Sequence, residues 1–122
     1  TDVSTIQADR IGAALEIARA FNAHVALKGC GTVIATPEEH WYINTTGNPG
    51  MGSAGMGDVL TGLIVALLAQ GWPAAAAIKA GVHLHGAAAD RLATRVGEIG
   101  LTAGETIPEA RLLFNQWITG ND

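Results

Sequence analysis

A glycine-rich segment followed by an apolar run places the tightest constraint on this chain. Residues 47–58 read GNPGMGSAGMGD and contain five glycines, and residues 59–68 are mostly apolar. Because glycine has no Cβ, such a loop lets backbone N–H groups crowd around a small ligand. The helix predicted after it directs a positive N-terminal end at an anion. Asp58 is the one acidic residue of the segment. The pattern therefore predicts a phosphate-binding loop with a carboxylate at its edge.

Length, charge and cysteine content limit the other possibilities. A chain of 122 residues, 48% of them hydrophobic, is expected to form one domain with a real core. Its net charge of −4, without a basic cluster, argues against a nucleic-acid partner. The apolar run ends at Gln70, short of the roughly 20 residues that a membrane helix needs. The single cysteine, Cys30, and the lack of a signal peptide favour the cytoplasm.

Hydrophobic periodicity predicts an α/β order of elements. Helices are expected over residues 8–21, 58–70, 74–96 and 108–118, and strands over 25–27, 32–35 and 41–44. The last two strands read as a hairpin, and Arg10 is expected on the solvent face of the first helix. Three short strands are too few for a complete doubly wound sheet. We therefore expect part of a larger fold, or a sheet that a partner completes.

Two common phosphate-binding patterns fit poorly. Residues 50–55 match G-x-G-x-x-G, but a dinucleotide site also needs an acidic residue about 20 positions later. The next acidic residue after Asp58 is Asp90. A P-loop needs a lysine directly after its last glycine, and no lysine follows any glycine of this loop.

A closer match exists over residues 25–90. The Gly-Met-Gly-Asp of residues 55–58 resembles the Gly-x-Gly-Asp signature of the ribokinase-like superfamily. Residues 48–51 and 55–62, together with LKGCGTVIA at 27–35 and GVHLHGAAAD at 81–90, resemble one branch of it, the ADP- or ATP-dependent NAD(P)H-hydrate dehydratases. The resemblance implies a ribokinase-like three-layer α/β fold, of which residues 1–122 would form the C-terminal part. We therefore expect a fragment, a proteolysed remnant or one piece of a split protein.

The resemblance also implies a reaction and a set of site residues. Family members repair hydrated NADH or NADPH by phosphorylating the hydrate and releasing phosphate, with ADP or ATP as donor. Asp58 would bind the substrate and act as general base. Backbone N–H groups of residues 55–57 would stabilise the transferred phosphoryl group. Phosphoryl transfer also implies Mg²⁺, although no metal ligands can be assigned. The nucleotide-binding residues carried over are Lys28, Gly29, Cys30, Gly31, Thr32, Asn48, Pro49, Gly50, Met51, Gly52, Ser53, Ala54, Gly55, Met56 and Gly57.

Several other polar residues have simpler explanations. His83 and His85 are two apart on a predicted helix, so they point in different directions and are poor joint metal ligands. Asp90 and Arg91 are expected to face solvent or to form a local ion pair. Cys30 is given no catalytic role. The tryptophans, Trp41, Trp72 and Trp117, are expected to anchor the core or an interface.

Two departures from the family leave alternatives open. Residues 52–54, Gly-Ser-Ala, replace the usual Ala-[Ser/Thr]-Gly, so a methyl group at Ala54 could narrow the loop or forbid a positive φ. The resemblance also covers only the C-terminal half of a dehydratase, so we expect the preceding half, with the early strands and much of the hydrate-binding surface, to be absent. Three hypotheses follow: a dehydratase domain that needs the missing half, another ribokinase-like small-molecule kinase, and a non-catalytic nucleotide-binding module. Self-association is expected in each case.

Overall fold

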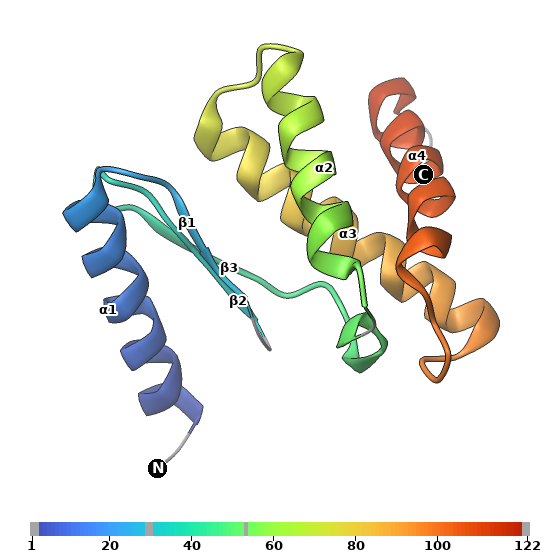
Figure 1. The fold of residues 1–122 in the computed structure, drawn as a ribbon, viewed down its shortest axis with the longest axis horizontal. Coiled ribbons are helices and arrows are strands. Elements are labelled where there is room, and N and C mark those ends of the chain that lie inside the picture. Colours follow the sequence, from blue (N-terminus) through green and yellow to red (C-terminus); the bar gives the residue numbers. More distant parts are fainter. Residues whose placement is uncertain (1–2, 29–30, 53, 121–122) are drawn as a thin grey trace.

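A small antiparallel sheet lies between helices in the computed structural model, which describes residues 3–28, 31–52 and 54–120. Helix α1 (Val3–Phe21) precedes strands β1 (Val25–Leu27), β2 (Thr32–Ala35) and β3 (Trp41–Asn44), which pair in that order. A short 3₁₀ helix, η1 (Pro49–Gly52), follows. Helices α2 (Met56–Ala69), α3 (Ala74–Val96) and α4 (Ala103–Thr119) complete the chain. Figure 1 shows α1 on one side of the sheet and the other helices on the opposite side.

Alternation along the strands builds three layers. Val33 and Ala35 of β2 pack against Ala14 and Ala18 of α1. Ile34, between them, points to the other face and packs against Leu60 of α2 and Val82 of α3. Successive side chains of a strand point to opposite faces, so β2 joins both helical layers. The predicted α/β three-layer class is confirmed.

The β2–β3 connection forms the predicted hairpin. The Thr36 N–H donates to the His40 carbonyl (2.9 Å), and the His40 N–H donates to the Thr36 hydroxyl (3.2 Å). Ala35 then pairs with Trp41, and Thr32 pairs with Asn44 at the far end. This register brings Thr32 and Asn44 to the same end of the sheet, next to the loop that leads to α2.

The predicted helix boundaries need correction at three places. Helix α1 begins at Val3 rather than at residue 8, and α2 begins at Met56 rather than at Asp58. Helix α4 begins at Ala103, with Pro108 inside it, rather than at Pro108. The Glu105 carboxylate explains the early start of α4, because it accepts hydrogen bonds from the Thr102 N–H (3.1 Å) and hydroxyl (2.8 Å). This capping arrangement satisfies donors that a helix leaves free at its N-terminus.

A buried carboxylate joins α3 to α4. Glu109 is 6% exposed and forms ion pairs with Arg91 (3.6 Å) and Arg95 of α3. Arg91 also donates to the Gln116 side chain (3.1 Å). The expected local pairing of Arg91 with Asp90 is therefore wrong.

None of the described helices is long and apolar enough to cross a membrane.

Candidate functional site

The glycine-rich loop delivers the N-terminus of α2 as predicted. Gly55 caps the helix in the left-handed region, at φ +86°. Ala54, directly before this cap, is exposed. Asp58 lies in the first turn of α2 and is exposed. The described residues offer its carboxylate no hydrogen bond or ion pair, so it is open to an external group.

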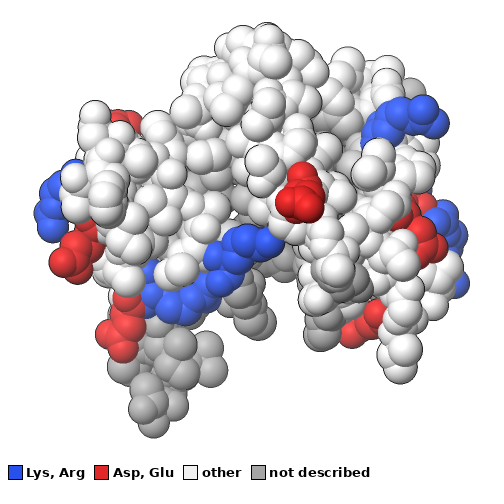
Figure 2. Space-filling view, in the orientation of Figure 1, with Lys and Arg blue, Asp and Glu red and all other residues white. Residues whose placement is uncertain are grey.

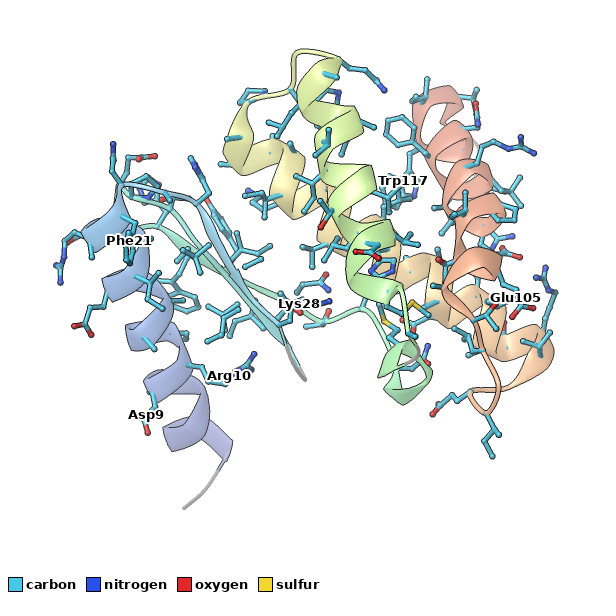
Figure 3. All side chains as sticks on the ribbon, viewed as in Figure 1. Asp9, Arg10, Phe21, Lys28, Glu105 and Trp117 are labelled. Atoms are coloured by element: carbon cyan, nitrogen blue, oxygen red, sulfur yellow. The ribbon has the colours of Figure 1, made fainter. Side chains whose placement is uncertain are left out.

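Lys28 approaches this helix end from the sheet. It follows β1 directly, and its Nζ lies 3.6 Å from the position that a Cβ on Gly57 would occupy. Figure 3 shows Lys28 between the end of the sheet and α2. The ammonium group and the positive end of the helix dipole therefore lie together, which favours an anion at this place.

Arg10 holds the turn that carries Lys28. Its guanidinium donates to the Gly31 carbonyl (2.9 Å) and to the Leu27 carbonyl (3.1 Å), on either side of the turn between β1 and β2. Figure 3 shows Arg10 reaching from α1 toward this end of the sheet. The expectation that Arg10 faces solvent is wrong. Periodicity alone could not reveal the carbonyl groups that it meets.

A cavity of about 410 Å³ lies beside Lys28. Figure 2 shows the molecule hollowed in the middle of this face, with basic side chains at the hollow and an acidic group over the first turn of α2. The volume is within the range of about 300–1,000 Å³ that is usual for small-molecule sites. The lining residues are Lys28, Gly31, Thr32, Asn44, Thr45, Thr46, Gly47, Asn48, Met51, Gly52, Met56, Leu60, Val82, His85 and Gly86.

The cavity brings together seven of the predicted nucleotide-binding residues. They are Lys28, Gly31, Thr32, Asn48, Met51, Gly52 and Met56. Five more predicted positions and Asp58 are placed on the loop or α2 but outside the lining: Pro49, Gly50, Ala54, Gly55 and Gly57. Gly29, Cys30 and Ser53 lie outside the described residues.

His85 forms part of the cavity wall from α3. It is 2% exposed, and its Nε2 atom has no hydrogen-bond partner within the described part of the chain. Burial lowers the pKa of His85 below its ordinary value of 6.5, and the nearby positive charge of Lys28 lowers it further. The imidazole is therefore neutral near pH 7. His83 is exposed instead and lies against the Trp117 ring (5.4 Å between centroids), so the two histidines diverge as predicted.

Asp90 holds the start of the glycine-rich loop, which sequence reasoning missed. Its Oδ2 accepts a hydrogen bond from the Gly47 N–H (2.9 Å), and its Oδ1 accepts one from the Asn48 side-chain amide (2.8 Å). The expected solvent-facing role of Asp90 is wrong. The available signal was its spacing from Gly86, since residues four apart share one face of a helix.

The tryptophans are only partly buried. Trp72 lies against Phe114 of α4 (6.1 Å between ring centroids), and Trp117 lies against His83. Trp41 and Trp117 are 47% and 40% exposed. Trp72 and Trp117 therefore join helices within the chain, whereas Trp41 presents much of its ring outward from β3.

The arrangement suits an anionic ligand with an apolar or aromatic portion. Lys28 and the start of α2 supply positive charge, while Met51, Met56, Leu60 and Val82 supply apolar surface. Within the described residues, no three His, Cys, Asp or Glu side chains gather as a metal site would require. The one carboxylate in the first turn of α2 is Asp58.

The sequence is similar to known dehydratases. The sequence model of the NAD(P)H-hydrate dehydratase family matches residues 1–109. An ADP-dependent (S)-NAD(P)H-hydrate dehydratase from Neisseria meningitidis serogroup B is 49% identical over 95% of this chain and 40% of its own length. A bifunctional NAD(P)H-hydrate repair enzyme from Moorella thermoacetica is 47% identical over 88% of this chain and 20% of its own length.

Solved structures show the same fold. An ADP/ATP-dependent NAD(P)H-hydrate dehydratase from Bacillus subtilis, co-crystallised with ATP and Mg²⁺, superposes with a TM-score of 0.83 at 32% identity. The match covers 92% of this chain and 40% of that one. This chain thus spans about 40% of the length of the Neisseria relative and of the solved dehydratase. The ribokinase-like fold implied by the sequence is confirmed over that part, and the chain belongs to the NAD(P)H-hydrate dehydratase family.

Proposed function

We propose that this chain carries the nucleotide-binding cavity and the general base of an ADP- or ATP-dependent NAD(P)H-hydrate dehydratase. The observation that carries the proposal is the meeting of Lys28 with the start of α2 at the cavity, 3.6 Å from the Cβ position of Gly57. The similarity to named dehydratases supports this function over that of another small-molecule kinase.

The cavity would hold the nucleotide. Lys28 and the backbone N–H groups at the start of α2 would bind the phosphates, because both present positive charge to the same space. The Thr32 hydroxyl, at the start of β2, is a further donor in the cavity wall. Gly29, Cys30 and Ser53 are proposed as nucleotide-binding residues from the family resemblance alone.

Asp58 would act on the hydrate rather than on the nucleotide. Its carboxylate is exposed, lies outside the cavity lining and has no partner among the described side chains. It would accept the proton of the hydrate's hydroxyl as that oxygen forms a bond to the terminal phosphorus of the nucleotide. With ADP as donor, the second product of this step is AMP. Loss of phosphate from the phosphorylated hydrate then restores the dihydronicotinamide.

Mg²⁺ fits this site as a companion of the nucleotide. Because Mg²⁺ is often bound through one or two carboxylates together with substrate phosphates, a single carboxylate at the phosphate end is compatible with it. Asp58 would contact the ion only through bound water, so that its carboxylate oxygens stay free to accept the proton of the hydrate's hydroxyl. The ion would neutralise charge on the transferred phosphoryl group.

The test is recovery of dihydronicotinamide absorbance from hydrated NADH or NADPH by the full-length protein. The proposal predicts recovery that requires both Mg²⁺ and ADP or ATP. Nucleotide binding without any recovery would instead support the non-catalytic module. Phosphorylation of an unrelated small alcohol, with the hydrates left unchanged, would support another kinase.

A further inference from the structure

Helix α3 holds the entrance of the glycine-rich loop at three successive places. The Thr46 hydroxyl donates to the His83 carbonyl (3.2 Å). The Thr46 backbone lies so close to Gly86 that a Cβ there would approach its carbonyl carbon to 2.8 Å. One turn later, both oxygens of Asp90 accept hydrogen bonds from the loop. The loop therefore follows the surface of α3 before it turns toward α2.

The polar contacts form a chain from Asp90 into the loop. Asp90 Oδ2 accepts from the Gly47 N–H (2.9 Å), and Asp90 Oδ1 accepts from Asn48 Nδ2 (2.8 Å). Asn48 Oδ1 in turn accepts from the Gly50 N–H (2.9 Å). Both ends of the Asn48 amide are thus engaged within the protein. Hydrogen bonds to a carboxylate are stronger than those between neutral groups, and both side chains are half-buried.

Asp90 acts on the cavity from behind its wall, through the residues that it holds. Gly47, Asn48 and Met51 line the cavity, whereas Asp90 does not. If the loop moved away from α3, the wall that these residues form would be lost, although Lys28 and Asp58 would stay on their own elements.

We propose that Asp90 is a positioning residue that sets the shape of the nucleotide cavity, and that the Asn48 side chain serves this relay rather than the ligand. The inference rests on the proposed function, because it takes the ligand to be a nucleotide. Asp90 fixes the backbone of residues 47–50, and the loop then presents a preformed wall. The consequence is an affinity for nucleotide that depends on matched hydrogen-bond donors and acceptors at positions 48 and 90, not on a charge at position 90 alone.

Exchanging the two side chains tests this directly. Asp90→Asn places an amide N–H₂ group against the amide of Asn48, and Asn48→Asp places two carboxylates together. The double variant Asp90→Asn/Asn48→Asp restores all three hydrogen bonds. Only the bond between positions 48 and 90 is reversed, with position 90 as the donor. The amide at position 90 still accepts from the Gly47 N–H and now donates to the new carboxylate, which still accepts from the Gly50 N–H.

Affinity for ADP in the full-length protein is the readout, with Glu16→Gln on the exposed face of α1 as control. Each single substitution is expected to weaken binding about tenfold or more, the size of one lost charged hydrogen bond. The double variant is expected to return to within about threefold of the parent, with KM for nucleotide following the same pattern. Equal affinity in all four proteins, or a double variant as weak as the product of the single effects, would overturn the proposal.

Amide exchange separates this inference from the proposed function. If the parent protein binds neither ADP nor ATP, the proposed function is wrong, and exchange of the Gly47 and Gly50 N–H groups decides the positioning role by itself. The role predicts faster exchange in both single variants and parent-like exchange in the exchanged pair. Unchanged exchange in the single variants would refute it.

Discussion

The charged residues of the site come from separate parts of the fold and have different roles. Lys28 follows β1, Asp58 lies in the first turn of α2, and Asp90 lies on α3. Lys28 lines the cavity, Asp58 stands outside it, and Asp90 holds the loop between them. Substitutions at Lys28 and Asp90 should therefore change the affinity for nucleotide, whereas substitution of Asp58 should change the rate of the reaction.

Lys28→Met should weaken nucleotide binding. The substitution keeps most of the apolar stem but removes the ammonium group beside Gly57. A lost charge-assisted contact of about 1.5–3 kcal/mol corresponds to roughly 10- to 150-fold in Kd, measured by calorimetric titration with ADP. Lys79→Met is the matched control, since Lys79 is the only other lysine of the sequence. Lys79 belongs to α3, where its ammonium group lies over the ring of Tyr42 from β3, and it is not part of the cavity lining. An equal loss of affinity in both variants would contradict the assignment of Lys28.

His85 should make stability depend on pH. Because burial lowers its folded-state pKa, the unfolded chain takes up a proton more readily below the ordinary value of 6.5. The free energy of unfolding should therefore fall as pH drops below 6.5, by at most about 1.4 kcal/mol per pH unit from this group. Above that pH the imidazole is neutral in both states and contributes no slope.

Denaturant titrations over this pH range measure the effect. His85→Gln should reduce the slope of stability against pH, whereas His83→Gln on the exposed face of the same helix should not. The same slope in the parent and in His85→Gln would show that His85 is not the group that titrates.

At the scale of elements, α3 is the helix that contacts every other part of the site. It packs against the sheet and α2 through Val82, against α4 through Leu84 and Ala88, and against the loop at Gly86 and Asp90. Small residues on α3 permit these approaches: nine residues of the helix are buried, and six of them are alanine, glycine or valine. Small side chains let α3 approach its neighbouring elements closely, and few large side chains fill the space between them.

The same substitution at two helical glycines should have opposite effects. Gly86→Ala puts a methyl group into the Thr46 backbone and should lower the free energy of unfolding by about 1–3 kcal/mol, as overpacking does. Gly62→Ala in α2 meets nothing within 4 Å and should raise stability by about 0.5–1 kcal/mol through helix propensity. Thermal unfolding measures both. A Gly86→Ala protein as stable as Gly62→Ala would mean that the loop does not rest on α3.

Local patterns predicted the elements better than their ends. The apolar run after Asp58 and the alanine-rich segment gave α2 and α3 almost to their bounds, because both are strongly periodic or apolar. The start of α4 was missed because Pro108 suggests a first turn, while the true cap is the Thr102–Glu105 pair. That pair is three residues apart and could have been found in the sequence.

At the scale of the whole molecule, the fold was predictable and much of the site's support was not. Local sequence motifs predict the glycine-rich loop, Lys28 and Asp58 as site residues. The family resemblance supports them because its motifs occur in the same order along the chain. Arg10 and Asp90 look like ordinary exposed helical charges until the sheet and α3 bring carbonyl and amide groups to them. Their partners are distant in sequence, so only tertiary structure could reveal these roles.

The proposed reaction requires that each nucleotide cleaved leads to the repair of one hydrate, with Asp58 as base. The most direct measurement is a parallel count of AMP formed and dihydronicotinamide recovered when the full-length protein and its Asp58→Asn variant act on hydrated NADH with ADP and Mg²⁺. We predict one AMP for each dihydronicotinamide in the parent, and a rate at least about 100-fold lower in the variant with ADP affinity retained. AMP formation without repair, or an Asp58→Asn variant as fast as the parent, would contradict it.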